Sequence, residues 1–268
     1  MKMIAVVLGC VVPAWAQEEG GRLDGTGERS WVVEFEPAAW YTSPGGMVVM
    51  PGGSAEADLA DVNLDSPRLS PFAEVRVRGG EWSLELSGYG YEASGRGSIS
   101  SGMAVGGLVI PAGSPVEASL GACSFEAALG YRVHEFRSEG ERGDVELTLD
   151  VTGGVRAHAL DLEVTGAGGR AEFDGVFAEP TVGMWMRFEF SRGLSLDVDA
   201  SVGGMFLENS TSISWDVLVG FRWDLGNGLA AQGGYRQHAF LLEEGEGIDR
   251  FRWRGAMAGV YAGMVFRF

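Results

Sequence analysis

The chain has 268 residues, of which 43 are glycine, and 46% of the sequence is hydrophobic. Lysine and arginine total 20 against 37 aspartate and glutamate, which gives a formal net charge of −17 at pH 7. This acidic balance argues against a nucleic-acid-binding protein, because neutralising phosphates requires a basic face. The apolar content is too high for a disordered polyelectrolyte, and a single all-β domain of about this length is common.

The first sixteen residues have the pattern of a secretory signal peptide. Lys2 supplies a positive start, the apolar run from Ile4 to Val12 has the length of a signal-peptide core, and Ala14-Trp15-Ala16 fits the small-residue cleavage pattern. Cleavage at that point would begin the mature chain at Gln17. The run is too short for a transmembrane helix, which needs about 20 apolar residues.

A second interpretation of this segment stays open. Val7-Leu8-Gly9-Cys10 loosely resembles a bacterial lipoprotein cleavage box, although it leaves an apolar core of only about five residues, below the usual 7–15. Under the first interpretation Cys123 is the one remaining cysteine, so no intramolecular disulfide is possible. Residues 17–29 are rich in glycine and glutamate and are expected to form a flexible N-terminal extension, followed by one domain over 30–268.

From Ser30 onward, apolar and polar residues alternate with period two, which places them on opposite faces of β-strands. In 213–224 the odd positions, from Ile213 to Trp223, are all apolar, whereas the even positions include Asp216 and Arg222. An apolar face with tryptophan near each end is typical of a strand that faces lipid, and Trp31, Trp215 and Trp223 are the predicted aromatic girdle. The alternation predicts strands at about 31–41, 68–78, 82–91, 116–134, 145–159, 177–190, 194–207, 212–224, 229–241 and 254–268.

The connections between these segments alternate in length. Tight-turn signals occur at Arg78-Gly79-Gly80-Glu81, Ser191-Arg192-Gly193 and Gly226-Asn227-Gly228, and longer Gly/Pro/acidic stretches fall between them at 42–67, 92–115, 160–175 and 242–253. Short turns on one side and long loops on the other are typical of outer-membrane β-barrels. We therefore predict an all-β fold: a transmembrane, antiparallel, up-and-down meander β-barrel of ten strands, with both termini on the periplasmic side.

Two alternatives concern strand number and fold. Met103 to Ile110 can supply a further strand, which makes twelve strands possible, and eight strands are the other alternative. The same alternation also fits a two-sheet sandwich that buries the apolar face and exposes the charged one. The barrel is favoured by the length of the strands and by the aromatic last residue. Closure has a strict physical reason, since every backbone N–H and C=O in hydrocarbon needs a protein partner.

The C-terminal strand carries the most specific signal. Val260, Ala262, Met264, Phe266 and Phe268 fall on one face of it, and Phe268 ends the chain. This pattern resembles the terminal signature of Gram-negative outer-membrane β-barrel proteins. The resemblance implies that Met264, Phe266 and Phe268 form an assembly signal for the barrel-assembly machinery in the bacterial outer membrane. It implies no activity, because the class hosts pores, enzymes, adhesins and structural anchors.

The charged inner faces predict a polar network inside the barrel, since a barrel of eight to ten strands is narrow enough for side chains to fill it. Three functional hypotheses follow: a structural or interaction barrel with a filled polar lumen, a narrow pore with a weak preference for cations because acids outnumber arginines, and a barrel enzyme that uses a lumen histidine. The predicted lumen charge network consists of Glu126, Arg132, Asp150, Arg156, Arg187, Glu189, Asp197, Asp199, Asp216, Arg222 and Arg236.

The histidines and serines give little support for catalysis. His158 and His238 fall near the outer ends of inward-facing positions and would have to meet across the lumen, whereas His134 falls near the inner end. No nucleophile elbow surrounds any serine, so the sequence predicts no enzymatic activity, no cofactor and no metal site. The expected partners are outer-membrane lipid and the barrel-assembly machinery, with no nucleic acid, and the expected oligomeric state is a monomer.

Overall fold

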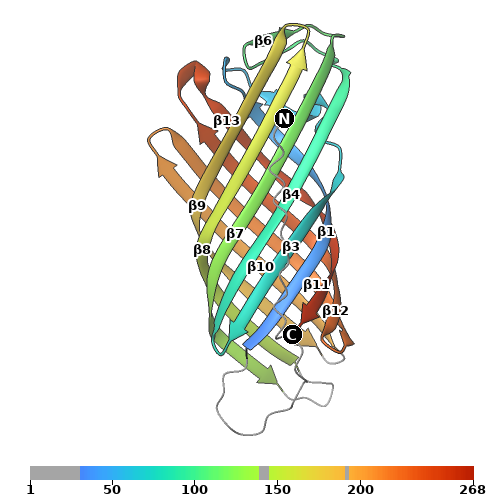
Figure 1. Ribbon diagram of the computed structural model, residues 1–268, viewed down its shortest axis with the longest axis vertical. Coiled ribbons are helices and arrows are strands. Elements are labelled where there is room, and N and C mark those ends of the chain that lie inside the picture. The colour runs from blue at the N-terminus through green and yellow to red at the C-terminus, as the bar shows by residue number, and fades with distance from the viewer. Residues whose placement is uncertain (1–30, 139–144, 191–192) are drawn as a thin grey trace, which may run out of the picture.

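The computed structural model describes residues 31–138, 145–190 and 193–268. The predicted signal peptide (1–16), the predicted extension (17–29), most of the 135–144 connection and the first two residues of the 191–193 turn lie outside the described residues. Within them, the chain forms a tall cylinder of tilted strands (Figure 1). We call the end that holds the C-terminus the lower end and the opposite end the upper end.

Ten antiparallel strands of the described chain form the cylinder, and each pairs with its neighbours in sequence. The predicted meander of ten strands is therefore confirmed, and the alternatives of eight and twelve are wrong. The strands are β1 (Trp31–Val49), β3 (Arg68–Gly79), β4 (Trp82–Ser98), β7 (Pro115–Ser138), β8 (Val145–Gly166), β9 (Gly169–Phe190), β10 (Leu194–Leu207), β11 (Ser210–Gly226), β12 (Leu229–Glu244) and β13 (Phe251–Arg267).

The cylinder closes because the first and last strands pair along most of their length. The register runs from Glu34 opposite Arg267 to Val49 opposite Arg252. At the lower end of this seam the terminal residue is held in both directions: Val33 N donates to Phe268 O at 3.1 Å, and Phe268 N donates to Val33 O at 2.9 Å. An open two-sheet sandwich is thereby excluded, since the ring has no free edge.

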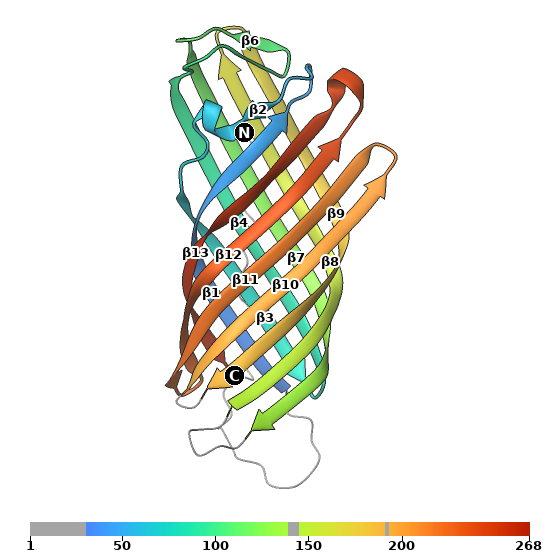
Figure 2. The same ribbon diagram turned by 180° about the vertical axis from the view of Figure 1, so that it is seen from behind.

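Small elements fill the connections at the upper end (Figure 2). The β1–β3 connection contains β2 (Ala57–Asp58) and the 3-10 turn η1 (Leu59–Val62), and the β12–β13 connection contains the 3-10 turn η2 (Gly247–Asp249). The extra segment suspected at 103–110 is a separate two-stranded hairpin, β5 (Met103–Val105) with β6 (Leu108–Ile110), outside the ring. No helix in the described part of the chain has both the length and the apolar character needed to cross a membrane.

The two faces of each strand are divided as the alternation predicts. On β11, Trp215 and Phe221 are exposed on the outside, whereas Ser214, Asp216 and Arg222 are buried inside. The strands nearby repeat this division, with Val202 exposed and Asp197 buried on β10. The lower part of the cylinder is therefore apolar outside and polar inside, which is the arrangement of a barrel that sits in lipid.

The strands extend further upward than the sequence analysis expected. The predicted loop at 160–175 is wrong, because β8 continues to Gly166 and β9 begins at Gly169. The predicted loops at 42–67, 92–115 and 242–253 are also too long, since β1, β4 and β12 end at Val49, Ser98 and Glu244. β8 and β9 each have 22 residues. At ~3.3 Å per residue and a tilt near 40° they rise roughly 55 Å, about twice the height of the lipid-facing band.

Above the lipid-facing band the polarity of the two faces reverses. On β8 the inward side chains change from Arg156 and His158 to Leu160, Leu162 and Val164, and the outward side chains change to Asp161 and Glu163. The strand keeps its period of two throughout, so its geometry does not explain the reversal. The reversal reflects a change in the solvent outside the barrel. Lipid covers the lower outer face, and water covers the upper one.

The connections at the upper end close the cylinder with apolar side chains. Leu59 is fully buried and Leu64 is 1% exposed, and Leu64 N donates to Leu59 O at 3.0 Å to fix the η1 turn. Ile110 of β6 is fully buried as well. We call this apolar plug the upper core; it consists of Val48, Met50, Leu59, Val62, Leu64, Val105, Ile110, Val116, Ala118, Leu120, Leu160, Leu162, Val164, Ala171, Phe177, Leu242, Phe251 and Trp253.

Tight turns join strands at the lower end, as predicted. Gly80 has a φ of 64° between β3 and β4, and Asn227 and Gly228 have φ values of 54° and 73° between β11 and β12. These left-handed conformations are favoured at glycine and asparagine and suit the twist of a two-residue hairpin.

The closed ring predicts resistance to detergent. Unboiled protein should run ahead of boiled protein in denaturing electrophoresis, because an intact barrel stays compact while every strand remains paired. Identical mobility before and after boiling would contradict closure.

The face assignment predicts that arginine reduces the free energy of unfolding by different amounts at two outward positions. Val219→Arg, in the lipid-facing band, should reduce the free energy of unfolding in lipid vesicles by about 2–4 kcal/mol. Ser119→Arg is the matched control: Ser119 faces outward on β7 opposite Glu163, above the band, and should cost almost nothing. Equal losses at the two positions would refute the reversal of polarity.

Candidate functional site in the barrel lumen

The lower lumen holds the charged residues that the inner-face pattern singled out. Arg156, Asp150 and Arg187 are 1%, 3% and 4% exposed, whereas Glu189 is exposed at the lower rim. Eleven residues were named from the sequence, and the structure places them in the barrel interior or at its lower mouth: Glu126, Arg132, Asp150, Arg156, Arg187, Glu189, Asp197, Asp199, Asp216, Arg222 and Arg236.

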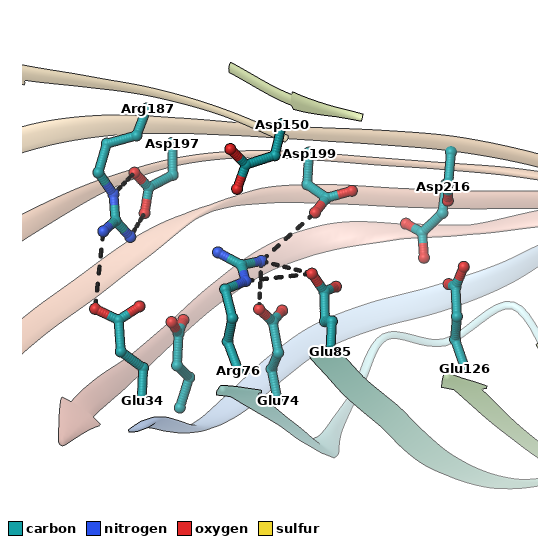
Figure 3. A network of polar contacts seen from close by, with 12 residues as sticks. Glu34, Glu74, Arg76, Glu85, Glu126, Asp150, Arg187, Asp197, Asp199 and Asp216 are labelled. Atoms are coloured by element: carbon teal, nitrogen blue, oxygen red, sulfur yellow. Dashed lines mark hydrogen bonds and ion pairs between the residues drawn. The ribbon is translucent and has the colours of Figure 1, made fainter. Parts of the chain in front are cut away.

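The lowest layer is organised around Glu34 of β1. Arg267 donates from Nε to Glu34 Oε1 at 2.8 Å, and Arg222 donates to Oε2 at 3.4 Å. Arg187 forms a bidentate pair with Asp197 at 2.8 and 3.1 Å, and its Nη1 lies 3.8 Å from Glu34 (Figure 3). One carboxylate thus ties together β9, β11 and β13, and planar guanidinium forks suit such pairing.

The next layer surrounds Arg76 with carboxylates from three strands. Its Nη2 lies 2.6 Å from Glu74, 2.9 Å from Glu85 and 3.8 Å from Asp199, as Figure 3 shows. The Arg76 side chain is 4% exposed. Three acids thus surround one arginine, in line with the excess of acids that the sequence analysis expected for the lumen as a whole.

Trp185 gathers three guanidinium groups at the same height. The centres of Arg76, Arg78 and Arg187 lie 4.5, 4.6 and 4.6 Å from the centroid of its ring. Trp185 is 3% exposed and points inward from β9. The aromatic face partly offsets the repulsion among these cations, and Arg78 also donates to Asp150 at 2.9 Å.

The upper polar layer is organised around Arg156 of β8. It donates to Glu126 at 3.0 and 2.5 Å, to Ser214 at 2.7 Å and to Ser201 at 2.5 Å. These partners come from β7, β11 and β10, so Arg156 spans the lumen. Such a network stabilises the fold only while its members remain paired.

Directly above Arg156, a fully buried Glu179 accepts hydrogen bonds from Ser212, at 2.6 Å, and from Ser214. His158 Nε2 lies 3.5 Å from the same carboxylate. The rings of His158 and His238 are 5.2 Å apart, so the two histidines do meet across the lumen. The central position of Glu179 depends on contacts between distant strands.

The surroundings of the histidines differ from the expected outer rim. His238 is fully buried, its Nδ1 lies 2.9 Å from the hydroxyl of Tyr89, and both histidine rings pack against Phe240. They therefore lie beneath the upper core and away from the outer rim. His134 is exposed and faces outward, because a bulge between Arg132 and His134 pairs it with the outward Leu149.

The described residues line cavities at two levels of the lumen. A central cavity of about 40 Å³ lies among Glu74, Asp199 and Arg236, and a larger one of about 220 Å³ lies at the lower mouth. Arg76 lines both. Within the described residues, no three histidine, cysteine, aspartate or glutamate side chains are grouped so that they could hold a metal ion.

The predicted girdle and terminal residues lie on the outer surface. Trp31 and Trp223 are 64% and 63% exposed near the lower rim, and Trp215 is 41% exposed higher on the same strand as Trp223. Phe266 and Phe268 are exposed beside the seam. Met264 is half-buried.

Comparison with known proteins gives similarity to solved structures alone. No protein-family model matches the chain, and no curated protein matches it. Solved outer-membrane β-barrels share its architecture, among them the outer membrane protease OmpT of Escherichia coli (9% identity, 91% of this chain, 100% of that chain, TM-score 0.45). Others are the Yersinia pestis attachment invasion locus protein Ail (11%, 88%, 99%, 0.36) and the Pseudomonas putida toluene transporter TodX (10%, 88%, 90%, 0.34).

The Arg156 network predicts a large loss of stability when its centre is removed. Arg156→Met should lower the free energy of unfolding by about 3–5 kcal/mol, because Glu126 and Glu179 would lose a buried cation. Arg96→Met is the matched control, since Arg96 pairs with Glu117 on the exposed surface, where such pairs contribute little. Denaturant titration in lipid vesicles measures both, and equal effects would contradict the network's structural role.

Proposed function

We propose that this chain is an outer-membrane β-barrel with a structural or interaction role and a lumen filled by its own side chains. The observation that carries the proposal is the upper core, which lies above the Arg156 and Glu179 layer across the cylinder. A solute entering from below would meet charged side chains first and the apolar upper core next. The fold itself is compatible with many activities, so the proposal depends on this filling.

A narrow cation pore is the second candidate. The excess of carboxylates around Arg76 favours it, since an acidic wall attracts cations. The upper core opposes it, because an ion leaves its hydration shell at great cost in an apolar environment.

Catalysis is a weaker candidate function than the filled lumen or the cation pore. His158, Glu179 and Ser214 are close enough for proton exchange, but His158 is 4% exposed and Glu179 is fully buried. A substrate would have to displace the upper core or cross the ion-pair layers to reach them.

The proposed setting follows from the same features. The exposed apolar band contacts outer-membrane lipid, the lower end faces the periplasm with both termini, and the terminal strand with Phe266 and Phe268 is the segment that the barrel-assembly machinery would recognise. A monomer fits this arrangement, since the closed ring needs no second copy to complete it.

Planar-bilayer recording tests the filled lumen against the pore. The reconstituted protein should give no steady conductance steps, and vesicles that contain it should not admit small sugars, because the upper core blocks the lumen. Steady open steps with a reversal potential that favours cations would reject the filled lumen and support the pore.

A further inference from the structure

The lower mouth of the barrel contains a cavity whose lining differs from the rest of the lumen. Its volume is about 220 Å³, far above the ~10–15 Å³ that a single water molecule needs. Among the described residues, its charged lining consists of the arginines Arg76, Arg78, Arg132, Arg187 and Arg267 and the glutamates Glu34, Glu146 and Glu189. Elsewhere in the lumen acids exceed bases, so this surplus of guanidinium groups is local.

Two of the three acids of this lining already pair with arginines, among them Arg267, which also lines the cavity. Glu34 accepts from Arg267 and Arg222, and Glu146 lies 2.7 Å from Arg137. Glu189, at the exposed rim, has no ion pair among the described residues. Acids outside the lining also pair with its arginines: Glu74 and Glu85 with Arg76, Glu135 with Arg132, and Asp197 with Arg187. The site therefore depends on the N–H groups that these pairs leave without a hydrogen bond.

Unused donors are present on the arginines themselves. Arg76 is 4% exposed, and its Nη1 is buried without a hydrogen-bond partner in the described chain. Arg132 Nε also lacks a hydrogen bond there, although it lies 3.5 Å from Asp150 Oδ1. Arg78 lines the cavity and uses Nη2 to reach Asp150. Buried donors without partners are costly, so an anion that accepted from them would be stabilised.

Trp185 holds part of this set in place. Arg76, Arg78 and Arg187 all lie over its ring and all three line the cavity, so three guanidinium groups are gathered in one part of its wall. Planar guanidinium forks match the oxygens of a tetrahedral oxyanion better than a point charge does. The like charges also repel one another, and a bound anion removes that repulsion.

We propose that the lower mouth is a binding site for a phosphate group, contacted by Arg76, Arg78 and Arg132. The phosphate can belong to free inorganic phosphate or to the headgroup of a neighbouring phospholipid. The site is blind, because the Arg156 layer and the upper core lie above it. Binding of phosphate at the lower mouth does not itself require a closed lumen, so conductance recording and ligand binding test separate claims.

Calorimetric titration of the folded protein in maltoside micelles at low salt tests the site. Inorganic phosphate is one probe, and micelles doped with phosphatidic acid, compared with micelles doped with uncharged monoolein, are the other. Saturable binding of free phosphate supports a solute site, and binding of phosphatidic acid alone supports a lipid-headgroup site. No saturable binding of either probe overturns the proposal.

Variants separate a built site from general attraction to positive charge. Arg78→Gln should weaken binding at least about tenfold, because a charged hydrogen bond is lost. Arg132→Gln, nearer the rim, should also weaken binding and gives the measurement if Arg78→Gln fails to fold. Glu189→Gln should tighten binding, since it removes a negative charge from the lining. Arg170→Gln is the control: Arg170 lies on the upper hairpin and should change nothing.

Two outcomes would reject the assignment even if phosphate binds. One is equal affinity of Arg78→Gln, Arg132→Gln and Arg170→Gln, which would place binding elsewhere. The other is weaker binding by Glu189→Gln. That result would mean that Glu189 supports the shape of the rim and does not repel the anion. The heat-dependent shift in electrophoretic mobility verifies that each variant is folded before its affinity is compared.

Discussion

The pairing of β1 with β13 is the constraint on which the rest of the molecule depends. Hydrocarbon offers no hydrogen-bond partners, so a sheet that spans it must leave no edge unpaired. The seam meets this requirement down to the last residue, where Phe268 and Val33 exchange backbone hydrogen bonds. Closure also creates the interior, because ten strands in a ring enclose a space that is narrow enough for arginine and glutamate to reach across it.

A second principle is that the solvent outside the barrel changes along its axis while the strand geometry does not. In the lower half the apolar side chains face lipid outside the barrel, and the charged side chains pair inside it. In the upper half the charged side chains face water outside the barrel. Leu160 and Leu162 pack inside, as they would in a small water-soluble barrel. One alternating pattern therefore serves two environments, and the layer of Arg156, Glu179 and the histidines marks the boundary between them.

Much of the lower half was predictable from the sequence. The alternation gave the correct inward side for Asp197, Asp216 and Arg222, because a one-residue shift would place them in lipid. The lower ends of the strands were also placed well, since Gly80 and Asn227 are unmistakable turn residues. These signals are local, so they survive without knowledge of the fold.

The sequence analysis did not predict the strands of the upper half, and the reason is physical. Where water is outside, a strand carries acids such as Asp161 and Glu163 on its outer face, and its composition approaches that of a loop. The alternating Leu160 and Leu162 were a usable signal, because they keep the register of Arg156.

The contacts of Glu179 with Ser212 and His158 could not be predicted. They depend on which strands face one another across the closed ring, and residue spacing along one strand does not contain that information. The extent of the cap over η1 and β5–β6 was hidden for the same reason, since loop side chains reveal their packing only when the rim is in place.

The height of the barrel above the bilayer limits how its exterior can vary. In a barrel with mobile loops at one end, insertions in those loops are well tolerated. Here Leu160, Leu162 and Phe177 of the protruding β8–β9 hairpin pack into the upper core, so an inserted single residue would turn such apolar side chains outward. Sequence variation at the upper end should therefore concentrate in outward positions and at the loop tips, because the shape of this wall is held from within.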